Sequence, residues 1–471
     1  MLGGTVSLLD GLEEISDALW YIPLILIVCL GIYSTLLLKG IQFRELKEMI
    51  RVTFSREKKG TKSLSSFQTF CVSMGNRIGV GNITGPVMAI LIGGPGAIFW
   101  MWVFACIGMA TSFVETTIGQ IYKMRKSDGH YHGGPAYTIM NGLGMKHFAS
   151  IVAFLMIMMY IVGFASMEVC SMSEALRGAF VFDNNALIFA SAITLITAAV
   201  VLGGMKNVAR VSTAIVPIMA LIWFVICVIS IALSNGGVTN ALGMIFSHIF
   251  SVPSAIGGTI GGMLIIGMKR GVLSNEAGVG TITNISSMAD VEHPVKQGLT
   301  QSLGVLIDTI ISTLTALVIL SFGDISSIVN LNNESVPLLQ DVLGSTIGAV
   351  APYLVAVMLT VFALTSLFGD FVIGENNLVF AKDNRTSRLI LRAVLLVVVF
   401  VSSFYASDGL FVIVDILLGI CAIVNALIIF KLGSKAAEAY RDYRRQREKG
   451  ADTPVFERGS VSEPAGIVEW Q

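Results

Sequence analysis

Long apolar stretches alternate with short polar connections along this chain. A helix needs about 20 mostly apolar residues to cross the hydrocarbon core of a bilayer, and eleven stretches meet that length. Two of them, 254–286 and 346–380, are too long for one straight span, which indicates broken or tilted helices. The eleven predicted spans are residues 18–40, 65–92, 96–122, 148–172, 184–204, 208–234, 254–286, 297–321, 346–380, 386–406 and 410–431.

Glycine and polar residues interrupt two of these spans. The first interruption is residues 74–86 (MGNRIGVGNITGP), and the second is residues 267–280 (GMKRGVLSNEAGVG). An unwound backbone at membrane depth is tolerated only where protein, water or ligand satisfies its amide and carbonyl groups. Such a pair, one in each half of the chain, is the strongest sequence indication of a secondary transporter's binding site. Close helix packing through the GxxxG spacings of the first interruption is the alternative interpretation.

Basic residues occupy every second connection. The connection 39–62 alone holds eight Lys and Arg residues, and the segment 431–449 is basic as well. Because basic loops stay on the cytoplasmic side, we expect a multi-pass protein of the plasma or inner membrane, with its N-terminus outside and its C-terminus cytoplasmic. The tail stretch 434–449 is either an amphipathic helix on the membrane surface or a solvated segment.

Ten spans remain when the first is set aside, and they divide into five and five. Because five is odd, the second five enter the membrane from the opposite side, which predicts an inverted repeat whose halves each open with a broken helix. The predicted units are 1–64 (N-terminal span and basic loop), 65–235 (first five-helix repeat), 254–431 (second, inverted repeat) and 432–471 (polar tail).

Composition agrees with a membrane protein and narrows its chemistry. The chain is 54% hydrophobic and 13% charged, whereas soluble domains carry about 25% charged residues. Its 31 basic and 31 acidic residues balance, so nothing indicates a nucleic-acid partner. The six cysteines lack CxxC spacing, and no HExxH motif or nucleophile–base pair is present. We therefore expect neither an enzyme nor a cofactor, and no cleavable signal peptide. We expect contact with membrane lipid but no obligate protein partner.

The first break suits a zwitterion and a cation. If the helix opens near residues 78–81, the free amides of the following half-helix face an anion such as a substrate carboxylate. The freed carbonyls of the preceding half-helix suit a hard cation such as Na⁺. The adjacent hydroxyls of Thr365 and Ser366 are either further ion ligands or bonded to their own helix.

Ionisable residues at membrane depth are expensive, and their usual roles are functional or paired. Arg77 lies inside the first break, where its guanidinium is either a fixed substitute for a bound cation or the partner of a carboxylate such as Asp308. Ion pairing between helices is the alternative for the others. The in-membrane charges are Arg77, Glu115, Lys269, Arg270, Glu276, Asp308, Asp370 and Glu375.

A series of motifs follows in order along the chain: GVGNITG (79–85), GGPGAIFWMW (93–102), GMAT (108–111), GGPAY (133–137), KRG (269–271), SNEAG (274–278), QGL (297–299), IDT (307–309) and GEN (374–376). Together they resemble the alanine/glycine:cation symporter family, whose members are sodium:alanine symporter-like amino acid carriers. The resemblance implies an all-α, leucine-transporter-like fold: two inverted five-helix repeats with discontinuous first and sixth core helices, plus one extra N-terminal span.

The resemblance also implies a function and a site. It implies import of a small neutral amino acid, such as alanine or glycine, with Na⁺ or H⁺ as the coupling ion and Na⁺ favoured. For Na⁺, the resemblance implies the carbonyls of Gly75, Ile78 and Phe362 with the hydroxyls of Thr365 and Ser366. For the substrate, it implies the amides around Gly79, Val80 and Gly81 at the carboxylate, and Asn76, Asn275 and carbonyls near Gly271 at the ammonium group. For charge pairing or coupling, it implies Arg77, Glu276 and Asp308.

Three departures from the family's pattern fall near the expected pocket. They are Thr84-Gly85-Pro86-Val87, Thr281-Ile282-Thr283 and Asp370-Phe371-Val372-Ile373. Asp370 could favour a larger, polar or cationic substrate, or it could face the cytoplasmic water path. An H⁺-coupled carrier, or a carrier of a larger polar amino acid, is the alternative function. An ion channel is disfavoured, since the two breaks are unlike and a filter would need symmetric loops.

Overall fold

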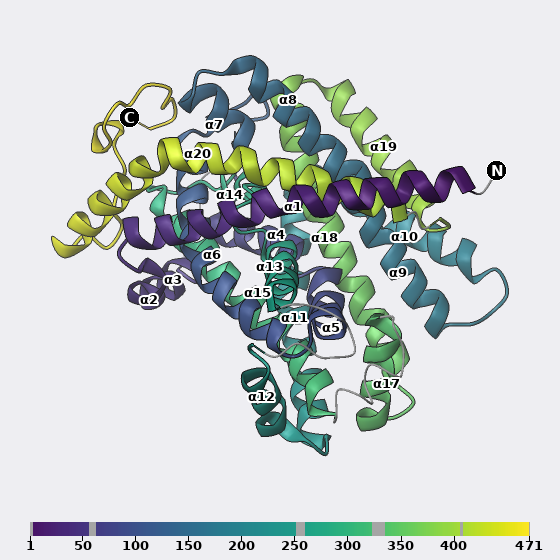
Figure 1. Cartoon of the computed structure of the whole chain (residues 1–471). Coiled ribbons are helices and arrows are strands. Elements are labelled where there is room, and N and C mark those ends of the chain that lie inside the picture. Colours follow the sequence, from purple (N-terminus) through teal and green to yellow (C-terminus); the bar gives the residue numbers. More distant parts are fainter. Residues whose placement is uncertain (1–2, 56–62, 251–259, 323–334, 406–407, 471) are drawn as a thin grey trace.

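The chain folds into a bundle of helices (Figure 1). The computed structural model describes residues 3–55, 63–250, 260–322, 335–405 and 408–470. Within these ranges the strands form one short hairpin, in which β1 (Met124–Arg125) pairs antiparallel with β2 (Tyr131–His132).

Seven helical segments of the described chain are long and apolar enough to cross a membrane. Each lies within a long helix or helical run, as expected because a span needs about 20 residues. The helices that carry them are α1 (Gly3–Leu37), α6 (Gly96–Ile121), the continuous run of α8 (Lys146–Ile157), η1 (Met158–Phe164) and α9 (Ala165–Ala179), α11 (Gly204–Leu233), α15 (Val295–Ser321), α18 (Ala351–Ala381) and α20 (Asp408–Glu448).

The other four predicted spans also contain helices, but these are shorter, broken or too charged to count as continuous spans. Two of them are the interrupted segments, and residues 254–259 of the second lie outside the described ranges. The helices are α4 (Ser66–Arg77) with α5 (Val80–Gly93), α10 (Asn185–Val201), α13 (Ile260–Asn275) with α14 (Thr283–Ser286), and α19 (Arg385–Ser402), which carries three arginines. The protein is thus an all-helical, polytopic membrane protein, and the eleven-span inverted repeat stays a prediction.

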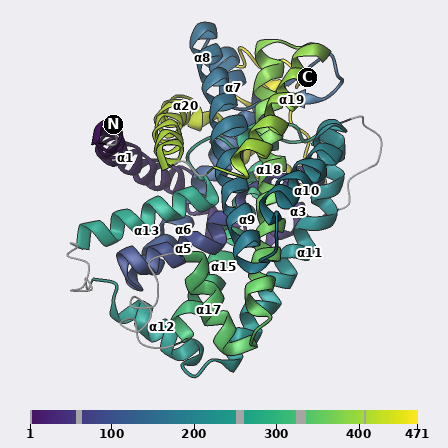
Figure 2. The same ribbon diagram turned by 90° about the vertical axis from the view of Figure 1, so that its right-hand side faces the viewer.

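Short helices connect the long ones or lie at the ends of the bundle. In Figure 2 the helices α7 and α8 lie at one end of the molecule, and α12 and α17 lie at the other. The remaining elements are α2 (Ile41–Arg44), α3 (Leu46–Thr53), α7 (Pro135–Gly142), α12 (Gly237–Ser247), α17 (Ser335–Ile347) and the 3-10 helix η2 (Arg458–Ser460).

Local sequence explains where the first broken helix begins. Ser65 caps α4 by accepting a hydrogen bond from the amide of Gln68 at 3.2 Å, and the Gln68 side chain accepts one from the Ser65 amide at 3.1 Å. This reciprocal capping box satisfies two amides that have no acceptor inside the helix. It places the start of α4 at the position that the apolar pattern predicts.

A π-helical turn interrupts the third long segment. The segment η1 separates α8 from α9, and such turns occur often at functional sites. Its Tyr160 is fully buried and donates a hydrogen bond to Glu276 at 3.0 Å. The turn therefore connects this segment to the second break.

The terminal helices lie side by side. Helix α1 packs along α20 across one face of the bundle (Figure 1). Helix α20 continues to Glu448, and its far end packs on the short helices, where the Tyr440 hydroxyl donates to Glu45 at 2.7 Å. The tail beyond α20 folds back, so that the indole of Trp470 donates to the carbonyl of Gln120 at 3.1 Å. The stretch from 434 to Glu448 is therefore helical, and the segment after it packs against the protein.

Candidate functional site

The first break is short and opens a new helix N-terminus. Helix α4 ends at Arg77 and α5 begins at Val80, so that Ile78 and Gly79 form the break. The amide of Ile78 bonds the carbonyl of Met74 at 2.7 Å, whereas Gly79 is extended. The first amides of α5 have no acceptor within the helix, and the helix dipole adds positive potential there. The break lies where the sequence predicts it.

The second break is longer and begins later than the glycine pattern suggests. Helix α13 continues through Gly271 to Asn275, and α14 begins at Thr283. Between them, Glu276, Gly278 and Gly280 adopt positive φ angles of 51°, 89° and 84°. The unwound segment is therefore residues 276–282, at the C-terminal end of the interruption seen in the sequence.

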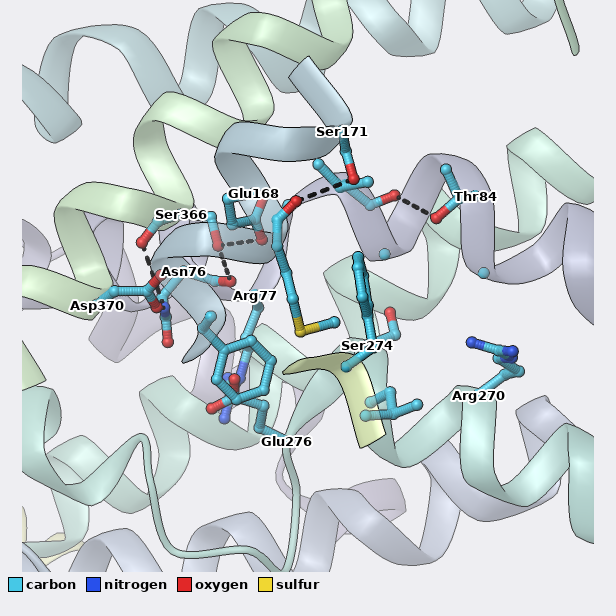
Figure 3. Close-up of a pocket in the computed structure, with 18 of the residues that line it drawn as sticks. Asn76, Arg77, Thr84, Glu168, Ser171, Arg270, Ser274, Glu276, Ser366 and Asp370 are labelled. Atoms are coloured by element: carbon cyan, nitrogen blue, oxygen red, sulfur yellow. Dashed lines mark hydrogen bonds between the residues drawn. The ribbon is translucent and has the colours of Figure 1, made fainter. Parts of the chain in front are cut away.

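A cavity of about 310 Å³ lies beside the first break. Figure 3 shows Asn76, Glu168, Ser366 and Asp370 grouped on one side of it, with Arg270 on the opposite side. A volume of this size accommodates a small amino acid. The lining comprises Asn76, Arg77, Gly79, Val80, Gly81, Thr84, Gly85, Phe164, Met167, Glu168, Ser171, Arg270, Leu273, Ser274, Glu276, Ser366, Asp370, Phe411, Val412 and Asp415.

The expected carboxylate-binding residues line this cavity. Gly79, Val80 and Gly81 all face it, at the N-terminus of α5. A Cβ atom on Gly81 would meet no atom within 4 Å, so space remains in front of its backbone. By contrast, a Cβ on Gly79 would lie 2.9 Å from the Glu168 carboxylate. The break and the cavity thus bring the N-terminus of α5 and open space together.

The residues expected to bind Na⁺ gather where α4 meets α18. A Cβ on Gly75 would lie 3.2 Å from the Cβ of Thr365, so the two backbones pack closely. The Thr365 hydroxyl donates to the carbonyl of Phe362 on its own helix at 3.0 Å and lies 3.4 Å from the sulfur of Met219. The Ser366 hydroxyl instead faces the break, 3.2 Å from the carbonyl oxygen of Asn76. Ile78 is buried and directly follows the last residue of α4.

Two residues expected at the substrate ammonium group are placed elsewhere. The side-chain oxygen of Asn275 accepts a hydrogen bond from the Ala277 amide at 3.0 Å, which caps the second break. Gly271 lies inside α13 and packs against the backbone of Met101. Neither residue lines the cavity. Asn76 does, and its amide nitrogen donates to Asp370 at 2.9 Å.

The buried charges are satisfied mainly by neutral groups. Arg77 donates to the carbonyl of Gln301 at 3.0 Å and to the Ser112 hydroxyl at 3.1 Å. Asp308 accepts from Asn82 at 2.7 Å and from Ser274 at 2.8 Å. In the described part of the chain no carboxylate lies within ion-pair distance of Arg77, so the suggested direct pair with Asp308 is not formed.

Two further in-membrane charges, Lys269 and Glu276, also have partners. Lys269 pairs with Asp415 at 2.8 Å, which agrees with the interpretation as an interhelical ion pair. Glu276 accepts from Tyr160 at 3.0 Å and from Thr281 at 2.5 Å, and it also lines the cavity. A role for Arg77, Glu276 and Asp308 in coupling stays a prediction.

Sequence analysis missed Glu168. This side chain, on α9, accepts a hydrogen bond from Ser366 at 2.8 Å and lies beside the amide of Val80. It is the one charged residue in the apolar stretch 148–172. A lone carboxylate in a membrane span is expensive and is functional by default, so that signal was available in the sequence.

Comparisons with known proteins identify the family. The profile of the sodium:alanine symporter family matches residues 6–458. The chain is 36% identical to the amino-acid carrier protein AlsT of Bacillus subtilis over 457 residues, which is 97% of this chain and 96% of the relative. It is 36% identical to the probable sodium/glutamine symporter GlnT of the same organism, covering 97% and 94%. It is 31% identical to the sodium/alanine symporter AgcS of Methanococcus maripaludis, covering 91% and 96%.

Proposed function

Because the chain belongs to the sodium:alanine symporter family, we propose that it imports a small neutral amino acid, such as alanine or glycine, together with Na⁺ by alternating access. Members of the family are transporters, so the chain is a cation-coupled amino-acid symporter and not an enzyme. The choice of Na⁺, the small neutral substrate and the mechanism are the parts proposed here.

The observation that carries the proposal is the first break beside the cavity. Three backbone positions, Gly79, Val80 and Gly81, face about 310 Å³ of space at the N-terminus of α5. Helix N-termini bind anions because their amides lack acceptors and the helix dipole is positive there. The anion proposed at this helix N-terminus is the substrate carboxylate.

The Na⁺ proposal follows from the oxygens on the other side of the break. Ser366 lies 3.2 Å from the carbonyl of Asn76, and Thr365 packs against Gly75. In the proposed ion-bound state, the carbonyls of Gly75, Ile78 and Phe362 and the two hydroxyls surround Na⁺. An ion held there joins α4 to α18, so that ion binding and the arrangement of the two halves of the chain depend on each other.

A polar substrate such as glutamine is the second candidate. Asp370 lines the cavity and is 1% exposed, and one relative is named a probable sodium/glutamine symporter. A buried carboxylate offers a hydrogen-bond acceptor to the side-chain amide of glutamine, which alanine and glycine lack. Coupling to H⁺ is the alternative for the ion.

The proposal is tested by uptake of radiolabelled alanine, glycine, serine and glutamine into proteoliposomes. We expect an inward Na⁺ gradient to drive accumulation of alanine or glycine above the equilibrium level. Accumulation driven only by a pH gradient would replace Na⁺ by H⁺, and preferential accumulation of glutamine would replace the substrate. No accumulation of any of the four by folded protein would contradict the proposal.

A variant at the break links uptake to the site. Gly81→Leu should abolish uptake, because the side chain would fill the space in front of the α5 amides. Gly243→Leu is the matched control, since a Cβ there also meets nothing within 4 Å but the residue lies on α12, away from the cavity. Equal uptake by the two variants would argue against substrate binding at this break.

A further inference from the structure

Three buried oxygen atoms at the cavity have no hydrogen-bond partner in the described chain. They are Oδ1 of Asn76, Oε2 of Glu168 and Oδ2 of Asp370. The three side chains are 5%, 8% and 1% exposed, and all three line the cavity. Buried acceptors without donors are rare because each carries a desolvation penalty. Their shared position indicates that a ligand with several donors completes them.

The other oxygens of this cluster are already bonded and hold it together. Ser366 donates to Oε1 of Glu168 at 2.8 Å, and Asn76 donates through Nδ2 to Oδ1 of Asp370 at 2.9 Å. The three helices α4, α9 and α18 thus each contribute one member. The free oxygens are the remaining acceptors of a connected network, and Figure 3 shows these side chains together.

No cationic side chain compensates the two carboxylates. Within the described ranges, neither Glu168 nor Asp370 has a Lys, Arg or His within ion-pair distance. Arg77 also lines the cavity, but its terminal nitrogens donate to Gln301 and Ser112. Arg270 lies on the opposite side of the cavity in Figure 3. Two carboxylates buried in the membrane without a counter-charge call for a cationic ligand.

We propose that Asn76, Glu168 and Asp370 form the subsite that binds an ammonium group of the amino-acid substrate. An ammonium group has three N–H donors and no acceptor, which matches three free acceptors and two uncompensated charges. This proposal rests on the proposed function, because it requires an amino acid in the cavity. The ammonium group is either the α-ammonium of a neutral amino acid or the side-chain ammonium of a basic one.

The subsite differs from the one that the family resemblance implies. Of the three positions suggested for the ammonium group, only Asn76 lines the cavity. Glu168 and Asp370 come from α9 and α18, outside both breaks. The position of Glu168 has a second consequence. Its carboxylate lies beside the Val80 amide, so a substrate bound across the first amides of α5 brings its own carboxylate and ammonium group to adjacent partners.

The side chains that line the cavity favour an ammonium group over a bare Na⁺ ion at this subsite. Hard metal cations prefer a close shell made of oxygen atoms, whereas the cavity of about 310 Å³ is also lined by Phe164, Met167 and Leu273. Apolar walls beside a polar end suit an organic cation, whose carbon atoms contact the walls while its N–H groups meet the oxygens.

The test compares ligands that share a carboxylate and differ in their amines. Purified full-length protein is melted in NaCl or choline chloride with alanine, 2,3-diaminopropionate or lactate, since a ligand that binds the folded state raises the melting temperature. We expect the amines to stabilise the wild type and lactate to have no effect. Glu168→Gln and Asp370→Asn should each weaken amine binding at least tenfold and leave the Na⁺ dependence of melting unchanged.

Matched variants separate the subsite from a general change of charge. Glu174→Gln lies on the same helix as Glu168 but is exposed, and Asp341→Asn lies on α17 and is exposed. Both should bind alanine as the wild type does. Loss of alanine binding in the subsite variants assigns the α-ammonium, and loss of diaminopropionate binding alone assigns the side-chain ammonium.

Other results would overturn the proposal. If the subsite variants bind both amines normally, or if they lose Na⁺ stabilisation while amine binding persists, the three oxygens do not bind an ammonium group. A wild type that responds to neither amine and accumulates no amino acid would contradict the proposed function itself. Wild-type uptake with unaffected variants would contradict only the subsite.

Discussion

The two breaks in the membrane helices are satisfied in different ways. At the first, Ile78 and Gly79 separate two half-helices, and the amides that follow face the cavity. At the second, the chain satisfies itself. Asn275 accepts from the Ala277 amide at 3.0 Å, and Asn425 donates to the Gly278 carbonyl at 2.9 Å.

This difference shows two ways in which unwound backbone is tolerated at membrane depth. Each unpaired amide or carbonyl in lipid costs several kcal/mol, so side chains or a ligand must satisfy it. The first residue of the second break, Glu276, lines the cavity, but the segment that follows it is bonded by the protein's own side chains and is expected to be structural. The first break leaves amides beside open space and is expected to be where ligands act. Substitutions at the two breaks should therefore affect different properties.

The largest expected effect is on folding, at the second break. Gly280 has a φ of 84°, and a Cβ there would lie 2.6 Å from Oδ1 of Asn425. Asn425 cannot move freely, because its amide nitrogen bonds both Glu115 and Gly278. Gly280→Ala should destabilise the protein by about 2–5 kcal/mol, combining left-handed backbone strain with overpacking. Thermal melting followed by size-exclusion chromatography measures this.

A control separates backbone strain from crowding. Gly450 has a φ of 88°, but a Cβ there meets nothing within 4 Å. Gly450→Ala should therefore show the smaller loss due to strain alone. A melting temperature for Gly280→Ala equal to that of the wild type would show that the second break tolerates change, and the contrast between the breaks would be wrong.

The next effect is on transport, at the first break. Gly79 has a φ of −106°, which alanine adopts without strain. A Cβ would nevertheless lie 2.9 Å from Glu168 and 3.0 Å from the Ser366 hydroxyl. Gly79→Ala should lower uptake roughly ten- to hundredfold, as about 1–3 kcal/mol of overpacking predicts, while the melting temperature changes little. Gly81→Ala should retain more uptake, since space is open there, and equal losses would contradict this geometry.

A smaller effect is expected on Na⁺ dependence, and it tests the neighbouring hydroxyls. Ser366→Ala should raise the Na⁺ concentration for half-maximal uptake roughly tenfold, the loss expected for one ligand of a charged group. Thr365→Ala should raise it only roughly threefold, because the Thr365 hydroxyl bonds Phe362 in this conformation and must turn to reach the ion. Thr360→Ala on the same helix is the control, since its hydroxyl donates to the carbonyl of Ala356 one turn earlier. Unchanged Na⁺ dependence in both variants would remove α18 from the ion site.

The smallest effect is predicted outside the membrane spans, at Asp128. Burial alone would raise the pKa of Asp128, but hydrogen bonds from His132 and the His130 amide and the charge of Arg388 outweigh it and lower the pKa to about 2. A lowered carboxylate pKa stabilises the folded state above the ordinary value of 3.8, and this contribution is lost as the pH falls through about 2.

Replacing this carboxylate should have a modest effect that is lost in strong acid. Asp128→Asn should destabilise the protein by about 1 kcal/mol after allowance for solvent screening. Melting of both proteins at pH 5 and below should give a difference that shrinks below pH 4. The same substitution at exposed Asp183 is the control. A difference that grows as the pH falls from 4 towards 2 would contradict the sign of this linkage.

Much of the fold could be predicted because its signals are local. The apolar stretches, the glycines of the first break and the capping residues around Ser65 act within a few residues, so α4 and α5 were expected where they occur. The second break was placed less well. Its glycines begin at Gly267, but α13 stays helical to Asn275, because tertiary packing against α6 overrides the weak helix propensity of glycine.

The site could be predicted only in part because several of its members meet across large sequence separations. Thr365 and Ser366 are adjacent in the sequence, yet one faces Met219 and the other faces the first break, since successive residues point about 100° apart on a helix. Glu168 and Ser366 are 198 positions apart and meet only because α9 packs on α18. No local pattern carries that information.

The sequence by itself determined that this is a polytopic helical membrane protein, that two of its spans are broken, and to which family it belongs. It could do so because burial in lipid and the need to satisfy the backbone impose local requirements on every span. Only the tertiary structure decided which oxygens remain free. Whether a buried Asn76, Glu168 or Asp370 is satisfied depends on the donors that distant helices bring within 3.5 Å. Hydrogen bonds act over such short distances that packing alone determines them.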